Sequence, residues 1–432
     1  MEWIVLSAFC AILLTFLWLN LPLLGALAAG LLLFLGYGRY RGLSWRALGR
    51  MCIEGVRTVK NILITFFLIG MLTALWRAAG TLPVIVCRAG RLIHPRAFLP
   101  TTFLLNCLIS TLTGTSFGTA ATMGVICATM GAAIGVDPRW VGGAILSGAF
   151  FGDRCSPVST SALLVAELTC TDIYDNIRRM VRTALAPFLL TCGIYGAVSA
   201  LTSAGTDLPN LETMFQQAFK LQWIAILPAG IILLMSLLRV NVRLSMAASI
   251  LAALPLCVGL QGMNLPEVAR TLVLGYHAPT AEVGKLIDGG GMVSMLRVAG
   301  IVCLSSSYSK LFEKTGLLNG ATRAVNRLAR RTTPYIATLC TAVVTAMIAC
   351  NQTLSILLTR QLCGALTDEG PRCAIDLEDT AVVVAPLIPW SIAGAVPLAT
   401  VSAPLSAMAA ACYLYLIPLW RAATSLWHQA RK

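Results

Sequence analysis

The chain has 432 residues, of which 57% are hydrophobic and only 12% are charged, and its mean hydropathy is +0.81. Soluble globular domains carry about 25% charged residues, so this composition excludes an ordinary soluble domain. It predicts an all-α polytopic membrane protein surrounded by lipid. The formal net charge of +14 does not indicate a nucleic-acid partner, because the basic residues lie in short loops between apolar segments, as cytoplasmic loops do.

The fifteen cysteines are scattered singly and there are only three histidines, so we predict neither a metal site nor a cofactor. Nor is there a nucleophile with a neighbouring base, so we predict a transporter rather than an enzyme. The segment from Met1 to Trp18 lacks a basic start and is expected to be the first span, not a cleaved signal peptide.

Apolar segments of spanning length recur along the chain, and about 11–13 spans are expected once broken helices are included. The uninterrupted ones fall at 3–19, 21–37, 62–79, 98–112, 116–135, 183–203, 221–239, 243–262, 291–309, 334–350 and 404–420. Residues 140–166 and 353–400 are interrupted by glycine, proline and charge, which predicts re-entrant or discontinuous helices. Residues 80–95 are ambiguous: either they return as a short span, or the count is off by one there.

Loop charge predicts the orientation. The loop at 39–60 is strongly basic, as are the loop at 323–331 and the tail at 421–432, and such loops stay in the cytoplasm. We therefore expect a bacterial cytoplasmic (inner) membrane protein with both termini inside. The counterpart loop at 263–290 is close to neutral, which indicates that the second half of the chain is inverted relative to the first.

Internal similarity supports two halves. Trp76 and Gly80 match Phe312 and Gly316, and the region around Pro157 matches that around Pro386. We predict inverted repeats at residues 1–203 and 218–432, joined by a linker at 204–217. In such architectures, discontinuous helices from the two halves meet at the membrane midplane and bind the substrate there.

The stretch from Ser147 to Glu167 is the most informative. It places Asp153 and Arg154 side by side in an apolar surrounding, where each ionisable group costs roughly 2.5–3.5 kcal/mol on insertion scales and so marks a functional site. We expect the stretch to form half of a transport site, with Arg154 either paired with Asp153 or extended to the interface.

Both halves contain a polar break, then an acidic residue, then a proline-broken apolar run. Two alternatives remain open. Gly114 and Gly118 could form a small-residue packing face, and Glu378 and Asp379 could merely cap a helix. Convergence favours a site where a carboxylate binds sodium or a proton in competition, since oxygen ligands suit hard cations. The strongest candidates are Asp153 and Asp379, then Glu378 and Glu167, with Thr113, Thr115, Ser116, Ser156, Ser159, Asn351, Gln352, Thr353 and Ser391 supplying oxygens.

The motifs SGAFFGDRCSP, TGTSFGTAATMG, NQTLSIL and LEDTAVVVAPLIPW, in this order and spacing, resemble the NhaC-type sodium/proton antiporter family, and GGGMVSMLRVAG and LFEKTGLL support the match. The resemblance covers nearly the whole chain. It implies a secondary antiporter with inverted repeats and elevator-like movement. The family also includes malate/lactate exchangers and relatives proposed to carry amino acids, so transport of a small organic anion or amino acid coupled to sodium or protons is the alternative.

This chain departs from the family pattern at several positions. Thr160 stands where a carboxylate is common, Ser391 where asparagine is common, and Arg297 where tryptophan is common. Arg297 could anchor an organic carboxylate or form a structural pair with an acid such as Glu378. The sequence leaves a homodimer open.

Overall fold

The computed structural model describes residues 2–19, 21–90, 95–202, 211–238, 240–315, 329, 332–349, 351–363, 366 and 370–430. These residues are almost all helical, and the only β-type pairing among them is an isolated bridge between Tyr276 and Gly289. The expected all-α class is confirmed for the described chain. The basic loop at 323–328 and 330–331, Gly316, residues 204–210 of the linker and the last two residues lie outside the described residues.

The first half contains a long series of helices, several of them joined by a single residue or a short break. They are α1 (Glu2–Trp18), α2 (Leu23–Tyr40), α3 (Trp45–Thr58), α4 (Lys60–Ala78), α5 (Thr81–Gly90), η1 (Pro95–Ala97), α6 (Phe98–Thr113), α7 (Ser116–Thr119), the π-helical η2 (Ala120–Gly124), α8 (Val125–Ala133), α9 (Pro138–Cys155), α10 (Thr160–Thr169) and α11 (Ile173–Thr202).

The second half has the same character and is more broken. It contains α12 (Leu211–Ala218), η3 (Trp223–Ile226), α13 (Leu227–Leu237), α14 (Val242–Pro255), the π-helical η4 (Leu256–Leu260), α15 (Leu265–Leu274), α16 (Ala281–Ile287), η5 (Met292–Met295), α17 (Leu296–Thr315), α19 (Pro334–Ala349), α20 (Gln352–Cys363), α21 (Gly370–Glu378), α22 (Ala381–Val384), η6 (Ala385–Leu387), α23 (Ile392–Thr400), η7 (Leu405–Ala410) and α24 (Cys412–Ala430).

Within the described residues, four continuous helical stretches are long and apolar enough to cross a membrane: Lys60–Ala78, Ser116–Ala133, Ile173–Thr202 and Val242–Leu260. A fifth crossing is formed if the pair Gly370–Leu387 and Ile392–Thr400, which is bent by 54°, counts as one broken span. Shorter apolar helices coincide with further expected segments, including Leu24–Tyr40 and Pro334–Ala349. The polytopic character is therefore confirmed, and the ambiguous residues 80–95 contain the short helix α5.

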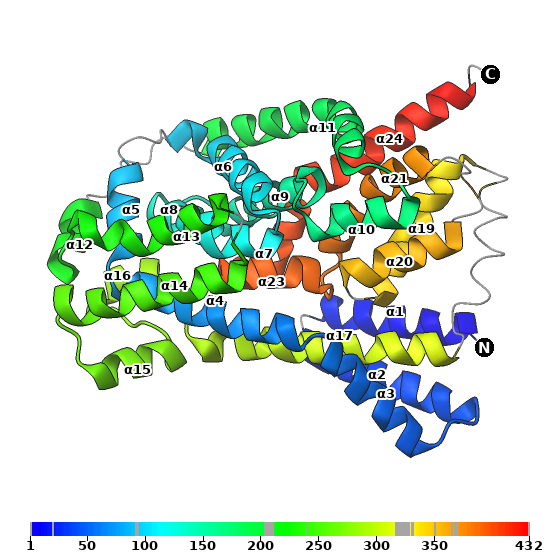
Figure 1. Cartoon of the computed structure of the whole chain (residues 1–432), viewed down its shortest axis with the longest axis horizontal. Coiled ribbons are helices and arrows are strands. Elements are labelled where there is room, and N and C mark those ends of the chain that lie inside the picture. The colour runs from blue at the N-terminus through cyan, green and yellow to red at the C-terminus, as the bar shows by residue number, and fades with distance from the viewer. Residues whose placement is uncertain are drawn as a thin grey trace.

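The expected break inside residues 140–166 is present. Helix α9 ends at Cys155, four residues pass without helical structure, and α10 begins at Thr160. A second break separates α6 from α7, where Gly114 adopts φ +64°, a left-handed conformation that glycine reaches without a Cβ penalty. Both breaks lie deep within the helical assembly shown in Figure 1.

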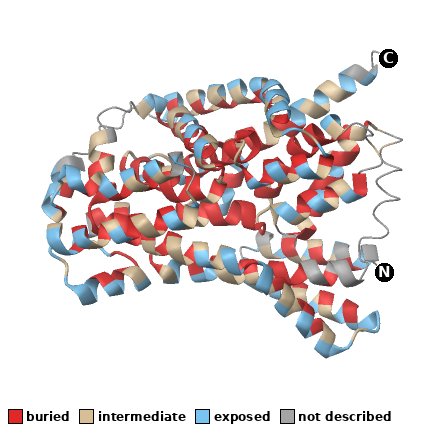
Figure 2. Ribbon diagram, viewed as in Figure 1, coloured by how far each residue is buried: buried red, intermediate tan, exposed pale blue. Residues whose placement is uncertain are grey.

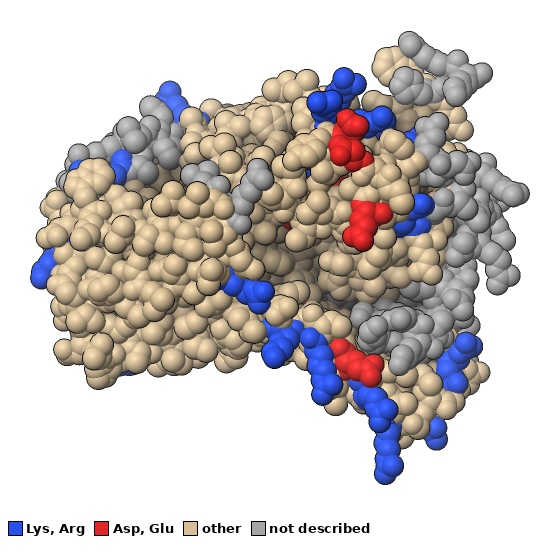
Figure 3. Space-filling view, viewed as in Figure 1, with Lys and Arg blue, Asp and Glu red and all other residues tan. Residues whose placement is uncertain are grey.

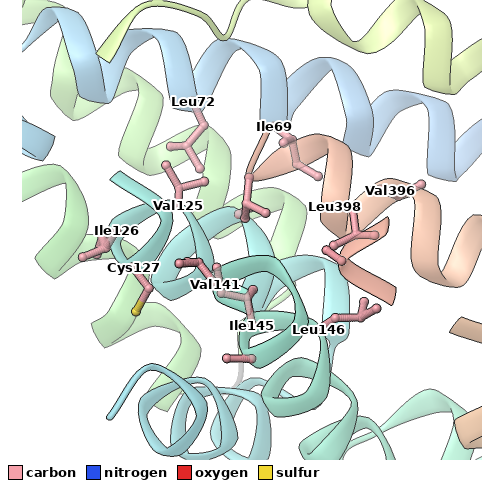
Figure 4. Packing of buried hydrophobic residues seen from close by; sticks show 14 of the residues in the cluster. Ile69, Leu72, Val125, Ile126, Cys127, Val141, Ile145, Leu146, Val396 and Leu398 are labelled. Carbon is pink, nitrogen blue, oxygen red and sulfur yellow. The ribbon is translucent and has the colours of Figure 1, made fainter. Parts of the chain in front are cut away.

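Buried residues fill the centre of the molecule, whereas its outer helices alternate buried and exposed faces (Figure 2). Figure 4 shows part of the largest apolar cluster from close by, to which α8 contributes Val125, α9 contributes Val141 and Ile145, and α23 contributes Val396. Burial of apolar area helps hold the broken helices in place, because their short pieces make few hydrogen bonds to one another.

Helix α9 approaches α6 closely because it has glycine at the contact. A Cβ atom built on Gly148 would lie 2.6 Å from Cβ of Asn106 and 2.7 Å from the carbonyl oxygen of Phe103. Small residues let membrane helices pack backbone to backbone. The contact fixes the C-terminal half of α9, which carries Asp153 and Arg154.

We predict that Gly148→Ala destabilises the protein, because the added methyl group overpacks the α6–α9 contact at a cost of about 1–3 kcal/mol. The matched control is Gly196→Ala in α11, where a Cβ would meet nothing within 4 Å. Thermal unfolding of the two purified variants in detergent measures the difference. Equal melting temperatures would show that the α6–α9 contact relaxes without cost.

Candidate functional site

Asp153 is the centre of the site. Its side chain is buried near the C-terminal end of α9, and the hydrogen-bonding groups around its carboxylate come from three other segments: Ser159 and Ser161 at the start of α10, the backbone N–H of Ser116 at the start of α7, and the amide of Gln352 at the start of α20. The positive ends of the helix dipoles stabilise negative charge at this position.

The break after α9 is held by serine hydroxyls. Ser159 and Ser161 both donate to the backbone carbonyl of Asp153, the latter at 2.9 Å, and Ser159 lies 3.5 Å from its carboxylate. Ser156 donates to the carbonyl of Thr111 at 2.7 Å. These bonds satisfy the carbonyls that a helix end leaves without partners, so the break positions Asp153 rigidly.

The threonines of the first polar break mainly make hydrogen bonds at the N-terminal end of α7. Thr115 is the N-cap of α7 and accepts from the N–H of Gly118 at 3.2 Å, while the Thr113 and Thr119 hydroxyls lie 3.2 Å apart. A π-helical turn, η2, follows at once, and such turns are frequent at functional sites. This arrangement exposes the N–H of Ser116 to Asp153.

The second half reaches the same point through α20. Asn351 caps this helix by accepting from the N–H of Leu354 at 2.8 Å. Gln352 donates to the carbonyl of Val382 at 3.0 Å and also reaches the Asp153 carboxylate. One side chain of the second half therefore helps to hold the acidic residue of the first.

Arg154 does not pair with Asp153 or reach an interface, so both expectations for it are wrong. It is fully buried and forms an ion pair with Asp379 of the second half. It also donates to Thr183 at 2.8 Å and to the carbonyl of Met180 at 3.2 Å, both on α11. Successive residues of a helix point about 100° apart, so Arg154 and Asp153 point to different neighbours.

Asp379 is part of a larger charge network. Its second carboxylate oxygen lies 3.0 Å from Nε of Arg421, and the same guanidinium lies 3.0 Å from Asp376. The guanidinium also lies 5.2 Å from the ring centre of Tyr335, whose hydroxyl donates to the Asp379 carbonyl at 3.2 Å. Asp379 is thus held between two arginines.

Glu378, unlike Asp379, forms no salt bridge within the described chain. It is fully buried, and neither of its carboxylate oxygens has a hydrogen-bond partner within the described part of the chain. Arg154, Asp379 and Asp153 are its electrostatic neighbours. The suggested structural pair between Arg297 and Glu378 is therefore absent.

The buried cluster is unbalanced in charge. Four carboxylates belong to it, from Asp153, Asp376, Glu378 and Asp379, against the two guanidiniums of Arg154 and Arg421. Ionisation of every group would leave a surplus of two negative charges in a low-dielectric interior, which is unfavourable unless protons or cations compensate it. Asp153 and Glu378 are the two carboxylates that no arginine holds.

Other expected residues lie elsewhere. Thr353, Glu167 and Arg297 are exposed, and Arg297 begins α17, away from the cluster. Ser391 is buried but caps α23 by accepting from the N–H of Ala393 at 3.3 Å. Within the described chain, no three His, Cys, Asp or Glu side chains are grouped to hold a metal, so a cation here would depend on carboxylate, hydroxyl, amide and carbonyl oxygens.

Sequence reasoning missed Asp376, Arg421 and Thr183. Asp376 lies three residues before Asp379, and this helical spacing places the two carboxylates on one face. The sequence therefore does contain a signal for Asp376. Arg421 was assigned to the cytoplasmic tail by its position after an apolar run, and no sequence signal indicated that it folds back onto Asp376 and Asp379.

Comparison with known protein families decides the class. The model of the Na+/H+ antiporter family matches residues 1–170 and 150–420. The chain belongs to this Na+/H+ antiporter family.

Individual relatives in the family differ in cargo. The Na+/H+ antiporter NhaC of Alkalihalophilus pseudofirmus is 27% identical over 371 residues, covering 83% of this chain and 80% of the relative. A malate-2H+/Na+-lactate antiporter of Bacillus subtilis is 26% identical over 404 residues, covering 90% and 86%. The arginine/ornithine antiporter ArcD of Halobacterium salinarum is 26% identical over 392 residues, covering 87% and 79%.

We predict that in this antiporter-family protein Asp379→Asn lowers stability strongly, because it leaves Arg154 buried without a full charge partner, a loss of about 3–5 kcal/mol. Thermal unfolding in detergent measures it. The double variant Arg154→Gln/Asp379→Asn removes both charges and is expected to recover much of the loss. A double variant as unstable as the single one would contradict the ion-pair explanation.

Proposed function

We propose that the protein is a sodium (cation)/proton antiporter of the cytoplasmic membrane in which Asp153 binds the cation and Glu378 carries a proton. The observation that carries this proposal is the pair of buried carboxylates without an arginine partner. Asp379, which the sequence ranked beside Asp153, is given a structural role instead, since Arg154 and Arg421 already neutralise it.

Asp153 is buried, which opposes its ionisation, but several hydrogen-bonding groups surround its carboxylate and offset part of this cost. Donors from the starts of α7, α10 and α20 face it, and charge-assisted hydrogen bonds of this kind stabilise an anion. The hydroxyls of Ser159 and Ser161 and nearby backbone carbonyls are oxygen ligands that suit a hard monovalent cation such as sodium. A cation entering here would replace these donors as the partner of the carboxylate.

Glu378 has the surroundings of a neutral carboxylic acid. Burying an ionised carboxylate with no hydrogen-bond donor is costly. Arg154 is the strongest charged neighbour of Glu378, but it is already paired with Asp379, and Asp379 and Asp153 add negative charge nearby. The protonated form is therefore favoured while Asp153 is negative. When a cation neutralises Asp153, the repulsion on Glu378 falls and its proton is released more easily, which couples cation binding to proton release.

We infer that two inverted repeats exchange contacts across the site. In the first half α2 packs against α17 of the second, and α14 of the second packs against α4 of the first. The helices that end the halves, α11 and α24, pack on each other. Such reciprocal pairing is what a two-fold relation between residues 1–203 and 218–432 would produce, with about 11–13 crossings, both termini in the cytoplasm and alternating access by an elevator-like shift.

The alternative cargo is a small organic anion or amino acid coupled to sodium or protons. The names of the malate/lactate and arginine/ornithine relatives favour it. Arg297 is a poor anchor for such a carboxylate, because it is exposed at the start of α17. Arg154 is already paired with Asp379, so it is not available to bind an organic carboxylate.

We predict that proteoliposomes holding the protein change their internal pH when a sodium gradient is applied without organic solute. Asp153→Asn abolishes both sodium exchange, followed with radioactive sodium, and the pH change, because the cation loses its carboxylate. Glu378→Gln retains sodium exchange but moves no protons, because a neutral amide mimics the protonated acid. The two readouts therefore separate the two carboxylates.

The matched control is Glu167→Gln, which changes an exposed glutamate of α10 outside the cluster and should transport like the unchanged protein. No pH change until malate, lactate or arginine is added would replace the sodium/proton function by the organic alternative. Normal proton movement in Glu378→Gln would refute the role proposed for Glu378.

A further inference from the structure

A basic cavity opens beside the buried charge network. Its volume is about 660 Å³, and it lies between the first turns of α11, the start of α21 and the C-terminal half of α24. Among the described residues, four arginines line it, Arg179, Arg182, Arg372 and Arg421, and Asp376 is the one acidic residue in its wall. We call this cavity the arginine vestibule.

Three of these arginines form no salt bridge within the described chain. Arg421 is held by Asp376 and Asp379, but Arg179, Arg182 and Arg372 are exposed and form no salt bridge with any residue the structure describes. Guanidinium groups that converge on one cavity repel one another unless an anion sits between them. Their planar donors match the oxygens of phosphate and carboxylate.

The rim of the vestibule on α11 has the features of a membrane boundary. This helix has 30 residues and so spans about 45 Å, whereas the hydrocarbon core is about 30 Å thick. Leu185 and Leu189, one and two turns after Arg182 on the same face, are 57% and 60% exposed. The basic first turns thus lie at headgroup depth, above an apolar stripe suited to an acyl chain. Figure 3 shows Lys and Arg gathered at the top of the view, over these turns.

Helix α24 borders the vestibule in the same way. Thr424 lines the cavity and shares a helix face with Trp420, four residues before it, and Trp427, three residues after it. Both tryptophans are exposed, and exposed tryptophan is typical of the membrane–water interface. The cavity therefore lies between two helices that each present apolar surface next to the arginines.

We propose that the arginine vestibule binds the phosphate of an anionic phospholipid, with Arg182 and Arg372 contacting the headgroup and the acyl chains lying along α11. Basic pockets between helices at the cytoplasmic side of a membrane suit such headgroups. A soluble phosphate offers the same charge, but it leaves the apolar stripe at Leu185 and Leu189 without a partner. The proposal does not depend on which ion the protein transports.

The vestibule is connected to the proposed transport site through the buried charge network. Arg421 lines the vestibule and also holds Asp379, which in turn pairs with Arg154, the neighbour of Asp153. A bound phosphate shares Arg421 with Asp376 and Asp379. Because Arg421 serves both the network and the vestibule, the test uses Arg182 and Arg372, which line the vestibule and form no salt bridge with the carboxylates of the network.

The test is native mass spectrometry of the full-length protein in detergent, titrated with phosphatidylglycerol or with phosphatidylcholine. We expect tighter binding of phosphatidylglycerol, and a loss of roughly tenfold or more in that affinity for the double variant Arg182→Gln/Arg372→Gln, since it removes two charge-assisted contacts. The thermal unfolding of the variant without lipid should match that of the unchanged protein, because both side chains are exposed.

The matched control is Arg178→Gln/Arg270→Gln, which removes the same charge from exposed arginines outside the vestibule and should leave the affinity unchanged. An equal loss in this control, or equal binding of the two lipids, would overturn the site in favour of general surface charge. Displacement of phosphatidylglycerol by inorganic phosphate at comparable concentration would overturn the lipid as occupant and assign the vestibule to a soluble anion.

Discussion

The ion pair between Arg154 and Asp379 is the interaction on which the site depends. Each partner directly follows an acidic residue, Asp153 in the first half and Glu378 in the second. Because consecutive helical residues diverge by about 100°, tying Arg154 to Asp379 turns Asp153 and Glu378 towards other surroundings. The pair therefore joins the two halves and leaves one carboxylate from each half without an arginine.

This arrangement explains how a membrane protein can keep so many carboxylates away from water. A hydrogen-bonded ion pair such as Arg154–Asp379 can be buried in the interior, whereas an unpaired buried charge is strongly destabilising. The two remaining carboxylates differ in their surroundings: donors from three helix starts face Asp153, and no donor in the part of the chain that the structure describes bonds to Glu378. In the proposed mechanism, that difference in environment, rather than in residue type, separates the cation-binding group from the proton-carrying one.

Much of the fold and part of the site could be predicted from the sequence. Apolar segments of spanning length indicated many of the helices, and the polar stretch at Ser147–Glu167 indicated the helix break next to Asp153. The partners of Arg154 and Arg421 could not be predicted, because an arginine reveals its carboxylate only when distant helices pack together. Glu378 and Asp379 are adjacent acids, and only their burial and contacts show that Asp379 is neutralised and Glu378 is not.

The departure at Thr160 fits this division of roles. The resemblance to NhaC-type antiporters implies a carboxylate at this position, which is the first residue of α10. Here Thr160 is exposed, while its neighbours Ser159 and Ser161 both donate to the carbonyl of Asp153. A carboxylate at this position would add negative charge at the helix start that faces Asp153 and would compete for the cation. With threonine, Asp153 is the only carboxylate among the described residues at that break, so in the proposed mechanism a cation there depends on Asp153 together with hydroxyl and carbonyl oxygens, while Glu378 of the other half carries the proton.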